Sequence, residues 1–444
     1  MLRIMRLSLL MVLLIITSIS IIEAQAATAT PTITVLQAEG VINPVLSDYI
    51  KRGIDRAEED NAVACIVQLD TPGGLDTSMR DIVKDIVNAR VPVVVYVSPS
   101  GARAASAGVF ITMAAHVAVM APNTVIGAAS PVAIGPEGEA AMSETMQEKV
   151  VNDAAAYIRS IAEAQGRNME WAEKAVREAV SATEREALEL NVIDMVAPDL
   201  DALISQLDGR DVTMLGGAVV TLNTQGATIN YIEMSLIEDF LYAISHPNIA
   251  FILLSLAMLG IMAEIFNPGL IFPGVVGAIS LLLAFFSLGM LPVNWAGILL
   301  IVLAFGLFIA EVFTPTFGLF TAGGITSLVI GSLILFKGGS PLFQIDPWLI
   351  AIVTILIAVF FLFILTRVLR AHRRQAATGR EELIGKTAVA KVALEPEGTV
   401  LFKGERWTAV SEKGRVKPGE EVIIRGIDGL ILRVIKKTTK EVNK

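Results

Sequence analysis

The sequence predicts a chain of three parts: a parallel α/β domain, an all-α membrane region with several spans, and a small all-β barrel. Residues 27–225 alternate apolar strands with amphipathic helices, and residues 249–367 consist of long apolar segments. Residues 380–444 consist of short alternating runs separated by Gly, Pro and Asp. Each pattern is typical of one class of structure, and residues 226–248 are expected to form a linker between the first two parts.

Composition supports a membrane protein with more than one domain. The chain has 444 residues, a mean hydropathy of +0.64 and only 18% charged residues. Its net charge of −9 gives no electrostatic support for nucleic-acid binding. Cys65, the single cysteine, lies in an apolar run and is expected to be a buried small side chain. With three histidines in the whole chain, we expect no metal site and no cofactor.

Residues 1–26 have the pattern of a secretory signal peptide. Arg3 and Arg6 precede an apolar core at Leu7–Ile22, and the small-residue cleavage site is Ala24-Gln25-Ala26. A retained anchor is the alternative interpretation. The domain that follows is expected to lie outside the cytoplasm.

The first domain is predicted to be a parallel sheet covered by helices. Its strands are nearly continuous apolar runs, which is typical of strands buried on both faces. The expected strands are 32–42, 62–70, 91–98 and 116–130, and the expected helices are 43–60, 75–89, 142–165 and 171–194.

Five apolar segments of about 17–20 residues follow, the length that a helix needs to cross a bilayer. The two shortest are also compatible with helices that are only half-buried. Arginines follow the last segment and mark the cytoplasmic side, and an odd number of spans also places the C-terminus inside. The segments are 249–265, 272–290, 295–313, 317–336 and 348–366, and the arginines are Arg367, Arg370, Arg373 and Arg374.

The membrane region contains an internal repeat. Residues 263–280, "AEIFNPGLIFPGVVGAIS", align without gaps to residues 310–327, "AEVFTPTFGLFTAGGITS". The repeat predicts two helical hairpins in the same orientation plus one further helix. Glu264 and Glu311 occupy matching places at span ends. An ionisable group there suggests a functional role, but a position before a turn favours a carboxylate that caps the turn.

Residues 380–444 are expected to form a barrel of about five strands. Barrels of this kind can bind oligonucleotides through stacked aromatic side chains. Because Phe402 and Trp407 stand nearly alone here, an interaction or structural module is favoured over nucleic-acid binding.

Two features follow predicted strands, at the sheet edge where α/β proteins place their sites. Gly73 and Gly74 follow the second strand, and adjacent glycines before a helix allow backbone N–H groups to point into a cleft, as an oxyanion hole requires. No phosphate-loop motif follows them. Ser106 opens a helix after the third strand, where the N–H of Ala107 faces the same point. The alternative is an N-cap serine in a tight helix–sheet contact.

A nucleophilic serine needs a base. His116 lies ten residues after Ser106 but starts a strand and is expected to pack at a turn. Lys149 is the first lysine after Ser106, and it follows Met142 and Met146 at helical spacing, so its amine is expected to lie on an apolar stripe. A solvated helix lysine is the alternative.

Four motifs in one order resemble the NfeD (nodulation-efficiency) membrane-bound serine proteases of the Clp-protease/crotonase superfamily. They are "LDTPGG", "GARAASAGVF", "MAPNTVIGAASP" and "EKVVNDAAAYIRSIAEAQGRN". The resemblance covers the whole chain, and its order of export signal, protease-like domain, membrane region and C-terminal barrel adds to its specificity.

The resemblance implies a Ser–Lys dyad. Ser106 matches the family nucleophile, Lys149 the general base, and Gly74, with Gly73 beside it, and Ala107 the oxyanion donors. Where soluble Clp protease has a histidine, this chain has Ala129. The family's partners are stomatin/prohibitin-like membrane proteins, which it cleaves in a hydrophobic segment. The barrel resembles the family's OB-like domain, and we expect a homo-oligomer with at least a dimer of the protease domain.

Three functions are therefore to be distinguished. The first is an extracytoplasmic Ser–Lys endopeptidase with its barrel in the cytoplasm. The second is a non-catalytic membrane scaffold that binds stomatin-like proteins. The third is a crotonase-like acyl hydrolase, for which no acyl-CoA adenine pocket is visible in the sequence.

Overall fold

The computed structural model describes residues 30–131, 144–269, 271–314, 316, 318–336, 343–373 and 383–437. The predicted signal peptide lies outside these residues, as do Met142 and Arg374. The chain divides into two units, one of residues 1–309 with 322–355 and one of residues 310–321 with 356–444.

The predicted parallel sheet is present and has six strands in the order β11-β1-β2-β3-β5-β8. Every neighbouring pair in it is parallel. The strands are β1 Thr32–Glu39, β2 Ala64–Asp70, β3 Val93–Val97, β5 Val117–Met120, β8 Met195–Val196 and β11 Thr228–Ile232. The segment expected to be a linker thus contributes β11, together with the helix α9 Leu236–Ile244.

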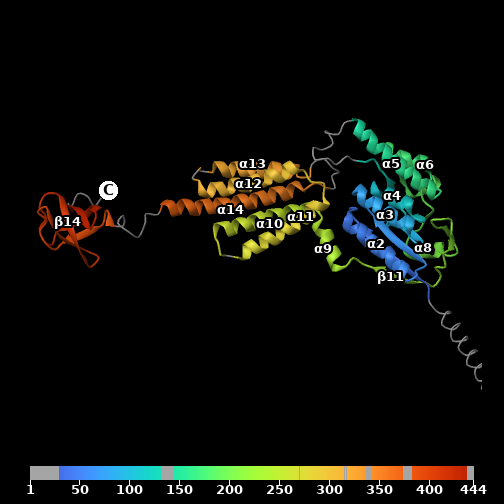
Figure 1. Ribbon diagram of the computed structural model, residues 1–444, viewed down its shortest axis with the longest axis horizontal. Coiled ribbons are helices and arrows are strands. Elements are labelled where there is room, and N and C mark those ends of the chain that lie inside the picture. The colour runs from blue at the N-terminus through green and yellow to red at the C-terminus, as the bar shows by residue number, and fades with distance from the viewer. Residues whose placement is uncertain are drawn as a thin grey trace, which may run out of the picture. The chain divides into compact units, whose positions relative to one another are not determined.

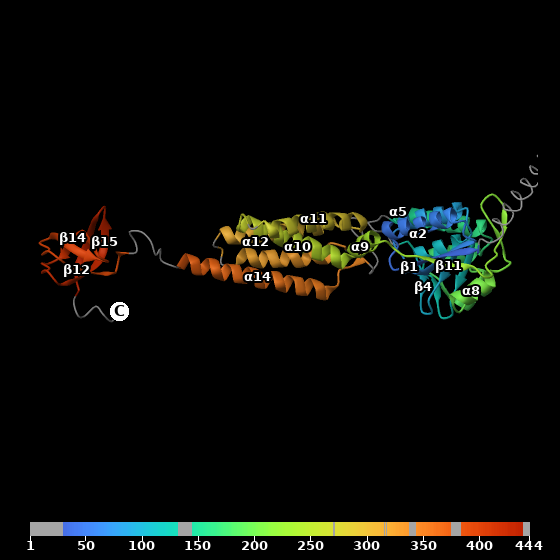
Figure 2. The ribbon, with the colours of Figure 1, turned by 90° about the horizontal axis from the view of Figure 1, so that it is seen from below.

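Both faces of this sheet are apolar, which explains the continuous apolar strands. Successive residues point to opposite faces, so Val67 packs with one core cluster and Ile66 with the other. Figure 2 shows α2 and α5 on one side of β1 and β11 and α8 on the other. The covering helices are α2 Pro44–Glu59, α3 Asp76–Asn88, α4 Ala107–Ala114, α5 Glu144–Ala164, α6 Met169–Arg177, α7 Glu184–Glu189 and α8 Leu200–Leu207.

A second, three-stranded sheet lies beside the first and was not predicted as a separate element. It has the order β4-β6-β7, with β4 Arg103–Ala105, β6 Val125–Gly127 and β7 Ser181–Thr183. The strand expected over 116–130 is therefore two strands in different sheets. The helix expected over 171–194 is likewise interrupted by β7. A short hairpin of β9 Asp211–Thr213 and β10 Val219–Thr221 completes the domain.

Helices lie where the five apolar segments were predicted (Figure 1). Among the described residues, three helices are long and apolar enough to cross a membrane: α10 Pro247–Phe266, α11 Phe272–Met290 and α12 Trp295–Phe313. The helix α13 Leu319–Ile334 and the apolar part of α14 Pro347–Arg373, residues Pro347–Phe363, are shorter.

The internal repeat is also a repeat of packing. A Cβ added at Gly277 would lie 3.0 Å from the carbonyl oxygen of Ala257, and one at Gly324 would lie 3.0 Å from that of Ala304. Small residues thus bring both helix pairs together at matching positions. The two carboxylates cap turns, as one interpretation predicted. Glu264 accepts from the N–H of Gly269 (3.2 Å), and Glu311 accepts from those of Gly318 (2.8 Å) and Thr321 (3.0 Å).

The C-terminal part is a closed barrel of five strands in the order β12-β13-β14-β16-β15. Its interior contains Val400, Ala409 and Leu432, all fully buried. The strands are β12 Thr387–Ala390, β13 Glu397–Phe402, β14 Glu405–Lys413, β15 Glu421–Asp428 and β16 Ile431–Lys436.

Candidate active site

The loop that follows β2 is held on both sides by backbone hydrogen bonds. On one side, the N–H of Thr71 donates to Arg103 (2.7 Å), and the carbonyl oxygen of Thr71 accepts from Ala105 (3.0 Å). On the other side, the N–H of Ile42 donates to Gly73 (2.9 Å). The N–H of Gly74 donates to no acceptor among the described residues, and is therefore available to a bound group.

Gly73 has a different role from the one predicted for it. Its N–H donates to the Thr71 hydroxyl (3.0 Å), which in turn donates to the Gly73 carbonyl oxygen (3.2 Å). The Gly73 N–H is thus already bonded, and Gly74 is the better oxyanion donor. Gly73 has φ +117, and a Cβ on it would lie 2.7 Å from the Ser106 Cβ. Only glycine allows this loop to approach the serine so closely.

Ser106 has a strained backbone, with φ +53 and ψ −112. This conformation costs a non-glycine residue of the order of 1–3 kcal/mol and is most often found at functional sites. Its N–H donates to Gly127 (3.1 Å), which fixes the residue against β6. The half-buried hydroxyl makes no capping bond, so the interpretation as a side-chain N-cap is wrong.

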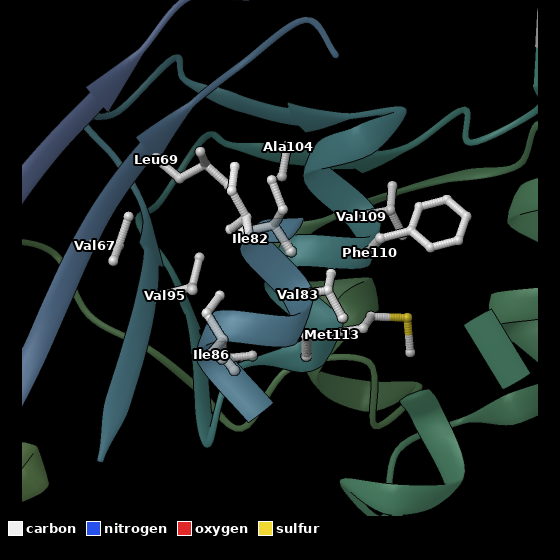
Figure 3. Packing of buried hydrophobic residues seen from close by; sticks show 14 of the residues in the cluster. Val67, Leu69, Ile82, Val83, Ile86, Val95, Ala104, Val109, Phe110 and Met113 are labelled. Atoms are coloured by element: carbon white, nitrogen blue, oxygen red, sulfur yellow. The ribbon is translucent and has the colours of Figure 1, made fainter. Parts of the chain in front are cut away.

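The small residues around Ser106 bring α4 onto the loop after β2. A Cβ on Gly108 would lie 2.7 Å from the Thr71 Cγ2 and 3.3 Å from the Ala104 Cβ. All eight residues of α4 are buried, and its Val109, Phe110 and Met113 belong to the same core cluster as Ile82 and Val83 (Figure 3). Ala107 is the first residue of α4, and its N–H has no acceptor within the helix.

Among the described residues, no contact joins Lys149 to Ser106. It is exposed in the second turn of α5, and Met146 beside it is 49% exposed. The expected apolar stripe depends partly on Met142, which lies outside the described residues. The exposure of Lys149 itself agrees with the solvated-lysine alternative.

Helix α5 nevertheless runs in the direction that the dyad needs. Its Tyr157 ring stacks on Phe110 with centroids 6.0 Å apart, and Gln165 donates to the carbonyl oxygen of Ala114 (3.2 Å). Both helices thus proceed in the same direction. Lys149 precedes Tyr157 by about 12 Å of helix, and Ser106 precedes Phe110 by about 6 Å. The N-terminal turns of α5 therefore lie toward the Ser106 end of α4.

His116 belongs to the scaffold. Its ring Nδ1 accepts from the backbone N–H of Val93 (3.1 Å), and its backbone N–H donates to the carbonyl oxygen of Val93 (3.0 Å). Burial is the main cause that lowers the pKa of His116 to about 4, and the nearby Arg167 cation adds to this shift. Ala129 is buried, and its N–H donates to the carbonyl oxygen of Ala175 (2.9 Å).

The fold and the site together define a class of protein. The serine is strained and lies at the start of a buried helix, and unpaired N–H groups lie next to it at the carboxyl edge of a parallel sheet. This is the arrangement of a serine hydrolase of the Clp-protease type. The apolar helices make it a membrane protein.

Family models match three successive parts of the chain. The N-terminal domain of NfeD1b matches residues 32–231, the NfeD integral membrane domain matches residues 248–367, and the NfeD-like C-terminal, partner-binding domain matches residues 380–436.

Named relatives agree with these matches. The membrane-bound protease PH1510 of Pyrococcus horikoshii is 39% identical over 410 residues, which cover 90% of this chain and 92% of the relative. The membrane protein NfeD1b of Bacillus subtilis is 27% identical over 426 residues, or 92% and 93% of the two chains. The chain belongs to the NfeD family, and its enzyme class is serine protease.

One solved structure is a lysine-to-alanine variant of the 1510-N membrane-bound stomatin-specific protease of that archaeon, in complex with a substrate peptide. It is 36% identical and covers 49% of this chain and 99% of its own, with a TM-score of 0.45.

Proposed function

We propose that this protein is a membrane-anchored endopeptidase with a Ser106–Lys149 dyad, and that it cleaves hydrophobic segments of stomatin-like, membrane-associated proteins. The observation that carries the proposal is the backbone of Ser106: a left-handed serine in contact with Gly73, with the unpaired N–H groups of Gly74 and Ala107 beside it. The substrate class comes from the stomatin specificity of the Pyrococcus relative.

In the proposed mechanism, the Ser106 Oγ attacks the scissile carbonyl carbon while the neutral Lys149 amine takes the hydroxyl proton. The N–H groups of Gly74 and Ala107 bind the oxyanion. Lys149 then gives its proton to the departing amine, and an acyl-enzyme remains. Lys149 next accepts a proton from a water as that water attacks the ester carbonyl carbon. It then returns the proton to the departing Ser106 Oγ, which releases the acid product and restores the serine and the neutral amine.

This mechanism requires Lys149 to leave water and to reach Ser106. A neutral amine is favoured when the group is withdrawn from solvent. We propose that assembly of protease domains, or binding of the substrate, covers the exposed N-terminal turns of α5. A homo-oligomer, at least a dimer, is part of this proposal, as is an extracytoplasmic protease domain with a cytoplasmic barrel.

The test is fluorophosphonate labelling of the full-length chain in detergent, together with cleavage of a hydrophobic peptide. Ser106→Ala should abolish labelling and reduce cleavage by about 10³-fold or more. Ser160→Ala, which changes an exposed serine on α5, is the matched control. Labelling that persists in Ser106→Ala would sink the assignment.

The alternative is a non-catalytic scaffold for stomatin-like proteins. The match of the barrel to a partner-binding domain favours it, as does the exposed Lys149. A parent chain that is neither labelled nor active, but that binds a stomatin-like protein through residues 380–436, would support this function instead.

A further inference from the structure

Helix α9 is connected to the membrane helices as well as to the protease domain. Two residues separate it from α10, and its last residue, Ile244, is buried. The Ser287 hydroxyl of α11 donates to the carbonyl oxygen of Ile244 (2.5 Å). The C-terminal end of α9 is therefore attached to the hairpin that α10 and α11 form.

The other end of α9 is attached to α2. Arg52 makes a two-pronged ion pair with Glu238, at 2.9 and 2.6 Å, and also donates to the carbonyl oxygen of Glu233 (3.0 Å). A bidentate pair of this kind fixes orientation as well as distance. Glu238 also completes a capping box with Ser235, so the start of α9 is well defined.

Between these attachments, Tyr242 reaches the loop that follows β1. Its hydroxyl lies 3.0 Å from the carbonyl oxygen of Glu39 and 3.2 Å from that of Val41, so the two oxygens share one proton. Gly40 lies between them with φ +98, and a Cβ there would lie 2.4 Å from the tyrosine oxygen. Burial raises the pKa of Tyr242 to about 12, so the hydroxyl keeps the proton that it donates.

The next residue of this loop holds the candidate oxyanion loop. The N–H of Ile42 donates to Gly73 (2.9 Å), and its carbonyl oxygen accepts from Leu75 (2.8 Å). Ile42 therefore has hydrogen bonds on both sides of Gly74. A Cβ on Gly74 would lie 2.1 Å from the Ile42 oxygen, which shows how tightly the two segments pack.

Packing around Tyr242 is incomplete, because a cavity adjoins both the tyrosine and the loop after β1. A cavity of about 760 Å³ is lined by Tyr242 together with Gln37 and Glu39 of β1 and with Leu291 and Phe343 of the membrane region. Side chains therefore do not close-pack around the tyrosine where it borders this cavity. Its hydrogen bonds to the loop after β1 therefore carry much of the connection.

We propose that Tyr242 is a positioning residue: it connects the membrane-attached helix α9 to the oxyanion loop, through Glu39–Val41 and Ile42, and so sets the direction of the Gly74 N–H. The inference rests on the proposed function for its catalytic consequence, but the mechanical connection stands on the contacts alone. Displacement of the hairpin by a lipid or partner would reach the active site by this route.

The test compares Tyr242→Phe with Tyr231→Phe in the full-length chain in detergent. Both variants remove one phenolic oxygen, and Tyr231 is 52% exposed without a hydrogen bond among the described residues. We expect Tyr242→Phe to lower kcat about 10-fold to 100-fold with KM nearly unchanged, because a misdirected donor weakens binding of the transition state. Hydrogen exchange should accelerate at the amides of Ile42 and Leu75, and Tyr231→Phe should change neither quantity.

The outcomes separate the two proposals. Unchanged kcat in Tyr242→Phe, with activity still dependent on Ser106, overturns the positioning role and leaves the protease assignment intact. If the parent chain shows no peptidase activity, hydrogen exchange alone decides: faster exchange at Ile42 and Leu75 supports the connection, and unchanged exchange overturns it. Equal falls in kcat and thermal stability in both variants would mean a general loss of structure and would also overturn it.

Discussion

The two halves of the candidate site are built in opposite ways. Ser106 donates a backbone hydrogen bond to Gly127, contacts Gly73, and lies at the start of a helix with eight buried residues. Lys149 is exposed and has no hydrogen bond or ion pair among the described residues. One half is pre-organised by backbone geometry, whereas the other is a long side chain with freedom of rotation.

This difference suggests a division of labour. Backbone donors and a strained serine need no rearrangement when charge develops, so they can be built into the fold. A lysine base must be withdrawn from water to be neutral, and a single exposed helix does not provide this. We therefore expect variants of the serine half to fail in the isolated chain, and variants of the lysine half to report on assembly.

The largest expected effect is at the lysine. Lys149→Ala should reduce peptide cleavage by about 10³-fold, because removal of one member of a unit costs nearly as much as removal of all. Lys84→Ala, which changes an exposed lysine on α3, should leave cleavage unchanged. Steady-state kinetics measure both. Full activity in Lys149→Ala would contradict the assignment of Lys149 to the second half of the site, because the base would then be another residue.

Next in size is Gly73→Ala. The added Cβ would lie 2.7 Å from the Ser106 Cβ, so the serine must move, and a displacement of about 1 Å costs about 100-fold in rate. The control is Gly101→Ala, because Gly101 also has positive φ, +95, but has open space around its Cβ position. Both variants carry backbone strain, and only the first should lose kcat/KM by this factor. Equal losses would assign the effect to strain alone.

A smaller effect is expected for Thr71→Val. The change retains Cγ2 against Gly108 but leaves the N–H of Gly73 without its acceptor, and we expect cleavage to fall about tenfold and stability by about 1–3 kcal/mol. Thr112→Val is the matched control, because the buried Thr112 hydroxyl has no partner among the described residues. It should be neutral or stabilising in thermal unfolding. A neutral Thr71→Val would show that this bond does not shape the loop.

The smallest effect on activity is expected for His116→Asn, which retains an acceptor for the Val93 amide. Cleavage should stay within about twofold. The pKa of His116 is about 4 in the folded chain, against an ordinary value of 6.5 for a histidine in the unfolded chain, so the unfolded chain binds more protons between these values. Stability therefore falls as pH drops from 6.5 toward 4, by at most about 3 kcal/mol. Denaturation curves of the variant should lack this dependence, and a large loss of cleavage would instead make His116 part of the site.

Sequence patterns predicted the elements whose signal is local and long. Four strands of the main sheet, the five apolar helices, the barrel and the packing repeat agree with the structure, whereas β8 and β11 of that sheet were not predicted. The elements that were missed are short and depend on distant partners. The three residues of β4 are too few to show a periodicity. β11 has no buried residue and no regular alternation, so its place beside β1 is decided by pairing.

The candidate site was predicted unevenly for the same reason. Ser106 and Gly74 could be proposed from the sequence because a glycine pair and a run of small residues are visible there. Thr71 was missed, although it precedes the glycines in "DTPGG", because its role depends on a turn that brings its hydroxyl to Gly73. The exposure of Lys149 was one of two alternatives, because helical spacing to two methionines does not show whether that face meets a neighbour.

The left-handed conformation of Ser106 also has an evolutionary consequence. A glycine at this position would relax the backbone and stabilise the fold while removing the nucleophile. A descendant selected only for its membrane and partner-binding functions could therefore accept this glycine and retain a more stable but inactive protease domain. The reverse substitution of glycine by serine would be harder, because it would destabilise the fold through backbone strain before any catalytic activity was regained.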